Sequence, residues 1–162
     1  MTPLPRVGVG YDVHRFSDDP DRPLVLGGVT FDEQAGLVGH SDADAAAHAI
    51  ADALLGAAGL GDIGQHFPDT DDEWKGADSL MLLRAIALRV RAAGFEIGNV
   101  DCTVITEAPK LAPMRESMEK NLSTAIDAPV TVKATRPEAL GALGRGEGLA
   151  CLAVALIVSV GD

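Results

Sequence analysis

The run of residues 149–160 constrains the fold more than any other part of this sequence, because it is apolar at nearly every position. It is too short to span a bilayer, for which about 20 apolar residues are needed. A run of this kind is typical of a central β-strand that is covered on both faces. We therefore expect a sheet that contains this strand and is packed against helices.

Other strand-like segments lie near the beginning and in the middle of the chain. Alternating apolar and polar residues predict strands at residues 7–14, 99–106 and 130–135. A turn-rich segment at 17–23 leads from the first of these into a strand-like run that begins at Leu24. This arrangement predicts an opening β-hairpin.

Helical periodicity separates the strand-like segments. Apolar residues at helical spacing predict helices at 42–58, from about residue 79 until Gly94, and from Pro113 onward. Ser41 is expected to cap the first helix, with Asp44 completing a capping box. Residues 61–76 follow neither period and are expected to form a long, functional loop. The predicted fold class is α/β, an α+β sandwich whose mixed β-sheet packs against helices, in one domain over residues 1–162.

The charge balance bears on possible partners. The chain carries 13 Lys and Arg against 24 Asp and Glu, a net charge of −11, and no cluster of cations interrupts this excess. Neither nucleic acid nor a membrane is an expected partner, because phosphate backbones repel such a chain and no apolar signal core or spanning segment occurs. Cys102 and Cys151 lie in apolar strand-like runs, as buried thiols of a reducing compartment do. We therefore expect a cytoplasmic protein.

Two short patterns have the spacing of metal ligands. Asp12 and His14 are two residues apart on a predicted strand, so both side chains leave the same face. His48 lies on the first predicted helix between Asp44 and Asp52, at four-residue intervals. Two histidines and one carboxylate would leave an open fourth position, as in catalytic zinc sites. A chance Asp-x-His triplet and a solvated helix face are the simpler interpretations of the two patterns.

Four further features are compatible with phosphate chemistry, and each has a simpler structural interpretation. His40 and Ser41 precede a helix N-terminus, which favours anions, although Ser41 could act only as a cap. Lys110 follows a strand, at an edge where ligands of α/β proteins often bind. Glu138 could hold magnesium or simply lie on the surface. The glycine-rich segment at 144–148 lacks the Lys-Ser/Thr ending of a P-loop and fits a turn at an interface better.

Taken together, these features resemble the 2-C-methyl-D-erythritol 2,4-cyclodiphosphate synthases, the ring-closing enzymes of the non-mevalonate isoprenoid pathway. The resemblance covers nearly the whole chain. It depends on GYDVH at 10–14, GHSDAD at 39–44 with His48, DALLGA at 52–57, GLGDIG at 59–64, FPDTD at 67–71, APK at 108–110, KAT at 133–135 and GRGEG at 144–148. Each motif is weak alone, and their order in one chain makes the resemblance specific.

The resemblance implies a homotrimer whose sheets surround a central channel and whose active sites lie between neighbouring subunits. It implies zinc on Asp12, His14 and His48, and magnesium or manganese on Glu138. The implied small-molecule substrate carries a cytidine diphosphate and cyclises by intramolecular phosphoryl transfer with release of CMP. The implied substrate contacts are His40, Ser41, Asp62, Gly64, Phe67, Asp69, Thr106, Lys110, Ala134, Thr135 and Arg145. Catalytic positioning is implied for His40, Lys110 and Thr135 and is also expected of Arg136, and Tyr11 and Arg145 match positions near the channel.

Three residues depart from the family pattern. Arg136 replaces a threonine expected after Thr135, so a guanidinium stands where a hydroxyl near the diphosphate is usual. Leu152 stands where many members carry glutamate, and Ala142 where many carry phenylalanine, so the family's channel ligands are not transferred to this chain. A zinc hydrolase would use the same three metal ligands, although the sequence offers no His-Glu-x-x-His motif. A non-catalytic trimer that binds a small ligand is the other alternative.

Overall fold

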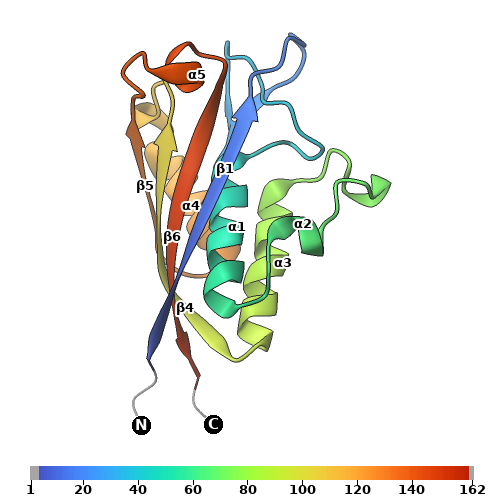
Figure 1. Cartoon of the computed structure of the whole chain (residues 1–162), viewed down its shortest axis with the longest axis vertical. Helices are drawn as coiled ribbons and strands as arrows, with labels where there is room; N and C mark the ends of the chain where they lie inside the picture. The colour runs from blue at the N-terminus through green and yellow to red at the C-terminus, as the bar shows by residue number, and fades with distance from the viewer. Residues whose placement is uncertain (1–3, 161–162) are drawn as a thin grey trace.

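The computed structural model describes residues 4–160 and contains a four-stranded mixed sheet with all its long helices on one side (Figure 1). The strand order is β1 (Pro5–Arg15), β6 (Gly148–Ser159), β4 (Phe95–Ile105) and β5 (Val130–Thr135). β6 is antiparallel to both of its neighbours, whereas β4 and β5 are parallel. The predicted mixed sheet packed against helices is therefore confirmed.

β6 is a central strand, as expected, but residues 4–160 cover only one of its faces. Cys151, Ala153 and Ala155 point toward the helices and are fully buried. On the opposite face Leu152 and Val154 are 38% and 40% exposed. They continue a row of exposed side chains on β1, and we call the whole set the bare sheet face: Val7, Val9, Tyr11, Val13, Leu152 and Val154. The expectation of cover on both faces is wrong for a single chain, because an apolar run does not reveal which molecule covers it.

Three helices form the second layer. α1 (Ala45–Ala58) packs against β1 and β6, α4 (Arg115–Ile126) packs against β5, and α3 (Ser79–Ala92) packs against both helices. Most of α1 is buried, since it lies between the sheet and α3. α3 and α4 each bury one stripe, which includes Leu83 and Ile86 on α3 and Met118 and Leu122 on α4. The core therefore lies between the sheet and these helices.

Two glycines allow β1 and α1 to approach closely. A Cβ atom on Gly10 would lie 1.8 Å from the carbonyl oxygen of Ala49, and one on Gly8 would lie 2.0 Å from that of Ala53. Only a residue without a side chain fits at such a separation. The strand that carries Asp12 and His14 is thereby held directly against the helix that carries His48.

The first helix begins three residues later than predicted, and its cap is Asp44 rather than Ser41. The Asp44 carboxylate accepts hydrogen bonds from Ala47 N at 3.1 Å, Gly27 N at 2.9 Å and Gly28 N at 2.8 Å. Its side chain is completely buried, so these three bonds replace its contact with water. The positive φ of Ala43, 58°, turns the backbone before the helix and leaves Ser41 outside it.

The predicted opening hairpin has the wrong partners. β1 pairs along its whole length with β6, while β2 (Leu24–Leu26) pairs with β3 (Val29–Phe31) in a separate two-stranded sheet. Gly27 and Gly28 form the two-residue turn of this small hairpin, with φ values of 57° and 68°. A strand of three residues cannot satisfy the eleven residues of β1, so the long β6 is the better partner.

Short elements complete the chain. The predicted loop at 61–76 contains α2 (Ile63–His66) and the 3₁₀ turn η1 (Asp72–Trp74). Pro113 opens not α4 itself but a 3₁₀ turn, η2 (Ala112–Met114), and α5 (Gly141–Gly144) precedes β6. β4 begins earlier than predicted, with a register shift between Ile97 and Asn99. None of the helices in the described residues is long and apolar enough to cross a membrane.

Candidate active site

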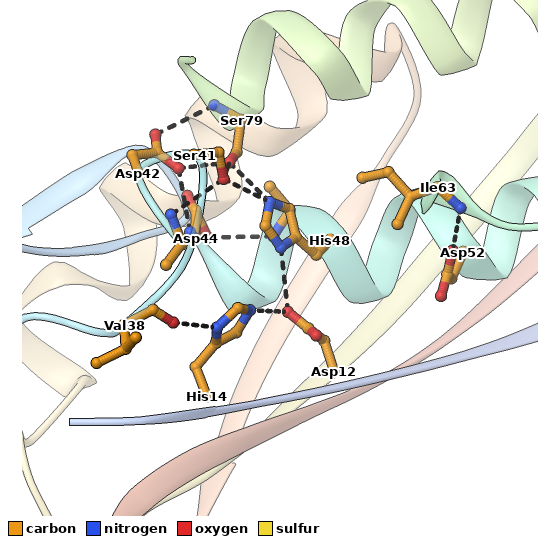
Figure 2. A network of polar contacts seen from close by, with 12 residues as sticks. Asp12, His14, Val38, Ser41, Asp42, Asp44, His48, Asp52, Ile63 and Ser79 are labelled. Carbon is orange, nitrogen blue, oxygen red and sulfur yellow. Dashed lines mark hydrogen bonds and ion pairs between the residues drawn. The ribbon is translucent and has the colours of Figure 1, made fainter. Parts of the chain in front are cut away.

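Asp12, His14 and His48 meet at the contact between β1 and α1 (Figure 2). Each contributes one potential ligand atom, and these atoms lie within 4.8 Å of one another. Asp12 Oδ2 lies 2.9 Å from His14 Nε2 and 3.2 Å from His48 Nδ1. The structure thus brings together the three residues for which the sequence predicts a shared metal ion.

The ring of His14 has a defined orientation. Its Nδ1 lies 2.6 Å from the carbonyl oxygen of Val38. Because a carbonyl oxygen can only accept, Nδ1 carries the proton of the neutral ring and Nε2 presents a lone pair. Nε2 is buried and has no hydrogen-bond partner, although the Asp12 oxygen is close. The lone pair of His14 Nε2 therefore faces a carboxylate oxygen of Asp12 in a buried site. A cation such as zinc binds donor atoms of these two kinds.

The electrostatics of the three residues favour positive charge between them. Burial raises the pKa of Asp12, but the contacts with His14 and His48 outweigh burial and hold that pKa well below its usual value. For His14, burial lowers the pKa and the Asp12 carboxylate raises it, with a net increase. Asp12 is therefore ionised at neutral pH, and its negative charge would attract a metal cation in the same way as a proton.

The two other carboxylates on the predicted helix face have structural roles. Asp44 caps α1, and its carboxylate is occupied by the backbone N–H groups of Gly27, Gly28 and Ala47. Asp52 accepts a hydrogen bond from Ile63 N at 2.7 Å and so holds the beginning of α2 (Figure 2). Burial raises the pKa of Asp52, and its backbone hydrogen bond opposes this effect. The four-residue spacing of Asp44, His48 and Asp52 therefore does not indicate a shared metal site, and the carboxylate beside His48 comes from Asp12 on β1.

A cavity of about 370 Å³ opens beside the three residues. It contains His40, Ser41 and Asp69, which the family resemblance implies around the methylerythritol phosphate, and the implied substrate contacts Gly64 and Phe67, together with His14 and His48. The sequence reasoning missed Ile63, Trp74 and Leu82, which also line it. Trp74 packs edge-on against Phe67 at 4.9 Å between ring centroids. The only tryptophan of the sequence lies in the loop that was expected to be functional, and this could have identified it as a residue that lines the cavity.

A second cavity, of about 290 Å³, lies where β4 and β5 end. It brings together Thr106, Lys110, Ala134, Thr135 and Arg136, all predicted contacts, with Glu107 and Arg115, which were not predicted. Lys110, Arg115 and Arg136 give this cavity three cationic side chains against the one carboxylate of Glu107. Arg115 lies in the first turn of α4, where a cation opposes the helix dipole, and this position could have marked it as a candidate.

Besides the metal ligand Asp12, three predicted site residues line neither cavity. Asp62 caps α2 through a 3.0 Å hydrogen bond from Gln65 N. Glu138 is exposed, at a positive φ of 54°, in the segment before α5. Arg145 is exposed and forms an ion pair with Glu147 at 2.8 Å. Tyr11, predicted to lie near a trimer channel, is on the bare sheet face opposite Leu152.

The two cavities share no lining residue. The first lies beside α1 and the loop that contains α2, and the second beside the ends of β4 and β5. Metal ligands and cationic side chains are therefore held in separate parts of one chain.

Comparison with known proteins shows extensive similarity. The profile of the YgbB family matches residues 5–158. The 2-C-methyl-D-erythritol 2,4-cyclodiphosphate synthase of Burkholderia ambifaria is 57% identical over 159 residues, which are 96% of this chain and 98% of that protein. The bifunctional enzyme IspD/IspF of an Anaeromyxobacter species is 58% identical over 157 residues, 95% of this chain and only 40% of the longer protein.

Solved structures agree with this similarity. The bifunctional IspDF of Campylobacter jejuni has a TM-score of 0.92 at 42% identity, over 97% of this chain and 43% of that one. IspF of Plasmodium falciparum, in a CDP complex, has a TM-score of 0.83 at 34% identity over 97% of both chains. Because sequence and fold agree over almost the entire length, the chain belongs to the YgbB family.

Proposed function

We propose that this protein is a 2-C-methyl-D-erythritol 2,4-cyclodiphosphate synthase. It converts 4-diphosphocytidyl-2-C-methyl-D-erythritol 2-phosphate into the cyclic diphosphate and CMP, a step in the synthesis of isoprenoid precursors. The observation that carries the proposal is the convergence of Asp12, His14 and His48 beside a cavity, with the unpaired Nε2 of His14 facing Asp12. The Burkholderia relative that bears this enzyme's name supports the assignment.

The reaction is an intramolecular phosphoryl transfer that eliminates CMP. An oxygen of the 2-phosphate forms a bond to the β-phosphorus, and the bond from that phosphorus to the bridging oxygen breaks, with its electron pair leaving on CMP. Because a phosphate is already a nucleophile, no general base is required. The enzyme has to bring anions together and hold them in line.

The chain's own residues suit this task. Zinc on Asp12, His14 and His48, and magnesium or manganese on Glu138, would supply positive charge to the phosphates. Lys110, Arg115 and Arg136 would bind the phosphates of the cytidine diphosphate half in the second cavity. The CDP complex of the Plasmodium relative supports a cytidine nucleotide as ligand of this fold. His40, Ser41 and Asp69 would orient the methylerythritol half in the first cavity.

We infer that the functional unit is a homotrimer with active sites between neighbours. One substrate must reach both metal ligands and cations, whereas a single chain holds them in separate cavities. The bare sheet face gives each copy an apolar surface of the kind that subunit contacts bury. We further propose that each subunit is one domain and that the trimer acts in the cytoplasm, with neither nucleic acid nor a membrane as partner; the buried thiols of Cys102 and Cys151 are compatible with a reducing compartment.

Product analysis tests the proposed function. Purified protein supplied with substrate, zinc and magnesium is expected to release CMP and cyclic diphosphate in equal amounts. His48→Ala removes one of the three ligands and is expected to lose bound zinc and nearly all turnover, while the assembly persists. Arg84→Ala, an exposed cation on α3 outside both cavities, is the matched control and should behave as wild type.

The same assay distinguishes the alternatives. An open-chain phosphate product would identify a zinc hydrolase. Binding of cytidine nucleotides without release of CMP from the substrate would identify a ligand-binding protein. Full activity of His48→Ala after stoichiometric loss of zinc would remove the metal from the mechanism.

A further inference from the structure

The outer ring nitrogen of His48 is connected to a buried serine and a carboxylate (Figure 2). His48 Nε2 lies 2.9 Å from the hydroxyl oxygen of Ser79, the first residue of α3. The Ser79 hydroxyl also contacts Asp42 Oδ1, and Ser79 N donates to Asp42 Oδ2 at 3.1 Å. Ser79 is only 1% exposed, so solvent water offers its hydroxyl little alternative. Neither Ser79 nor Asp42 has a place in the mechanism described above.

The chemistry of these three groups determines the direction of each hydrogen bond. An ionised carboxylate can only accept, so the hydroxyl proton of Ser79 is donated to Asp42. With its only proton used, the Ser79 oxygen can only accept from His48 Nε2. Nε2 must therefore carry the proton of the neutral imidazole. Nδ1 is then left with a lone pair, and this atom faces Asp12 at 3.2 Å.

Ser41 is consistent with this assignment. Its hydroxyl oxygen lies 3.2 Å from His48 Nε2 and also accepts a hydrogen bond from Ala43 N at 3.2 Å. The Nε2 proton can thus be shared between two hydroxyl oxygens. No contact of Ser41 requires Nε2 to act as an acceptor.

We propose that Ser79, held by Asp42, is a positioning residue for the metal centre that fixes His48 in the tautomer whose Nδ1 lone pair points toward the metal. The inference rests on the metal site of the proposed function and adds two residues to it. Loss of such a hydrogen bond behind a ligating histidine typically weakens metal binding by about 10-fold to 100-fold. The reason is that the ring must then adopt the correct tautomer and orientation without help.

Three variants of the full chain test the proposal. Ser79→Ala removes the acceptor of the Nε2 proton. Asp42→Ala removes the carboxylate that accepts the Ser79 proton, so the hydroxyl is free to donate to Nε2 and the preference for a proton on Nε2 is lost. Asp78→Ala is the matched control, because Asp78 caps the same helix through Leu80 N at 2.9 Å and does not contact His48. It weakens the helix by about 1 kcal/mol without changing the ring's hydrogen bonds.

Two readouts independent of turnover decide the outcome. Chelator competition against zinc-loaded protein should show zinc affinity reduced by about 10-fold or more in Ser79→Ala and Asp42→Ala, and unchanged in Asp78→Ala. Nitrogen-15 NMR of the histidine rings after zinc removal should show His48 protonated on Nε2 in wild type and in Asp78→Ala. Asp42→Ala should shift that proton toward Nδ1.

The proposal is overturned if Ser79→Ala keeps wild-type zinc affinity, or if Asp42→Ala leaves the Nε2 proton in place. A purely structural role of Ser79 would make Ser79→Ala resemble Asp78→Ala, with lower thermal stability and the same zinc affinity. A wild-type chain that binds no zinc would contradict the proposed function instead, and the NMR comparison would still decide the role of Asp42 and Ser79.

Discussion

Arg136 stands at a position for which the family resemblance implies a threonine near the proposed substrate. It lines the second cavity with Lys110 and Arg115, so its charge adds to an existing cationic group. A guanidinium can bind two phosphate oxygens at once, whereas the threonine hydroxyl expected at this position offers one donor. We therefore expect Arg136 to take over part of the anchoring of the diphosphate.

The kinetics of two variants test this role. If Arg136 binds the diphosphate equally in the ground and transition states, Arg136→Thr and Arg136→Ala should raise KM several-fold or more and change kcat less. A tenfold change corresponds to about 1.4 kcal/mol of binding free energy. Steady-state assays at saturating magnesium measure both constants, with Arg84→Ala as the control. Identical constants in wild type and both variants would show that Arg136 points to solvent.

At the level of residues, the sequence predicts the metal ligands better than it predicts the residues that orient these ligands or line the cavity beside them. Asp12 and His14 were identifiable because residues two apart on a strand share a face, and His48 because it lies off the apolar stripe of its helix. Ser79 and Trp74 come from segments more than 25 residues beyond His48, and only the packing of α3 and η1 brings them to the site. No local spacing rule contains that information.

At the level of elements, the contact between β1 and α1 determines whether the metal ligands meet. Gly10→Ala would place a methyl group 1.8 Å from the Ala49 carbonyl, so the helix must move away from the strand. We expect a loss of about 1–3 kcal/mol in unfolding free energy from overpacking. Zinc affinity should fall as well, because the shift separates His48 from Asp12 and His14. Denaturant unfolding and chelator competition measure the two effects.

Gly56→Ala is the matched control for this contact. Gly56 lies on α1, and a Cβ there would be 3.9 Å from the carbonyl of Val9, an ordinary contact distance. Alanine is the better helix former, so this variant should keep zinc affinity and gain up to about 1 kcal/mol in stability. Equal zinc affinity in Gly10→Ala and Gly56→Ala would contradict the role given to the close approach.

The bounds and partners of an element were predictable where they depend on its own sequence. They were uncertain where they depend on residues far away in the chain. The strand at 130–135 was predicted with its observed bounds, because alternation and flanking turns lie within its own sequence. The start of α1 was not, because the buried Asp44 is fixed by Gly27 and Gly28 from another part of the chain. The partner of β1 was also missed, since β6 lies at the far end of the chain and strand pairing over such a distance leaves no local pattern.

At the level of the whole molecule, the proposal that sites are shared predicts complementation between inactive chains. His48→Ala disables the first cavity and Lys110→Ala the second. In an assembly that mixes the two, a site formed by an intact first cavity and a neighbour's intact second cavity is complete. Random 1:1 mixing should make about a quarter of the sites complete. Activity after denaturation and refolding together, compared with each variant refolded alone, measures this fraction, and no recovery would place each site within one chain.

Because the two cavities are separate within one chain, the catalytic rate per chain should also depend on the protein concentration. In the proposed assembly an isolated chain is folded and can hold metal, yet it has no complete site. The rate per chain then depends on how much protein is present: it climbs with concentration until assembly saturates, and only beyond that point does total activity follow the amount of protein linearly. Dilution would inactivate the enzyme before it unfolds, and a copy with one defective cavity would impair only the site that this cavity shares with a neighbour.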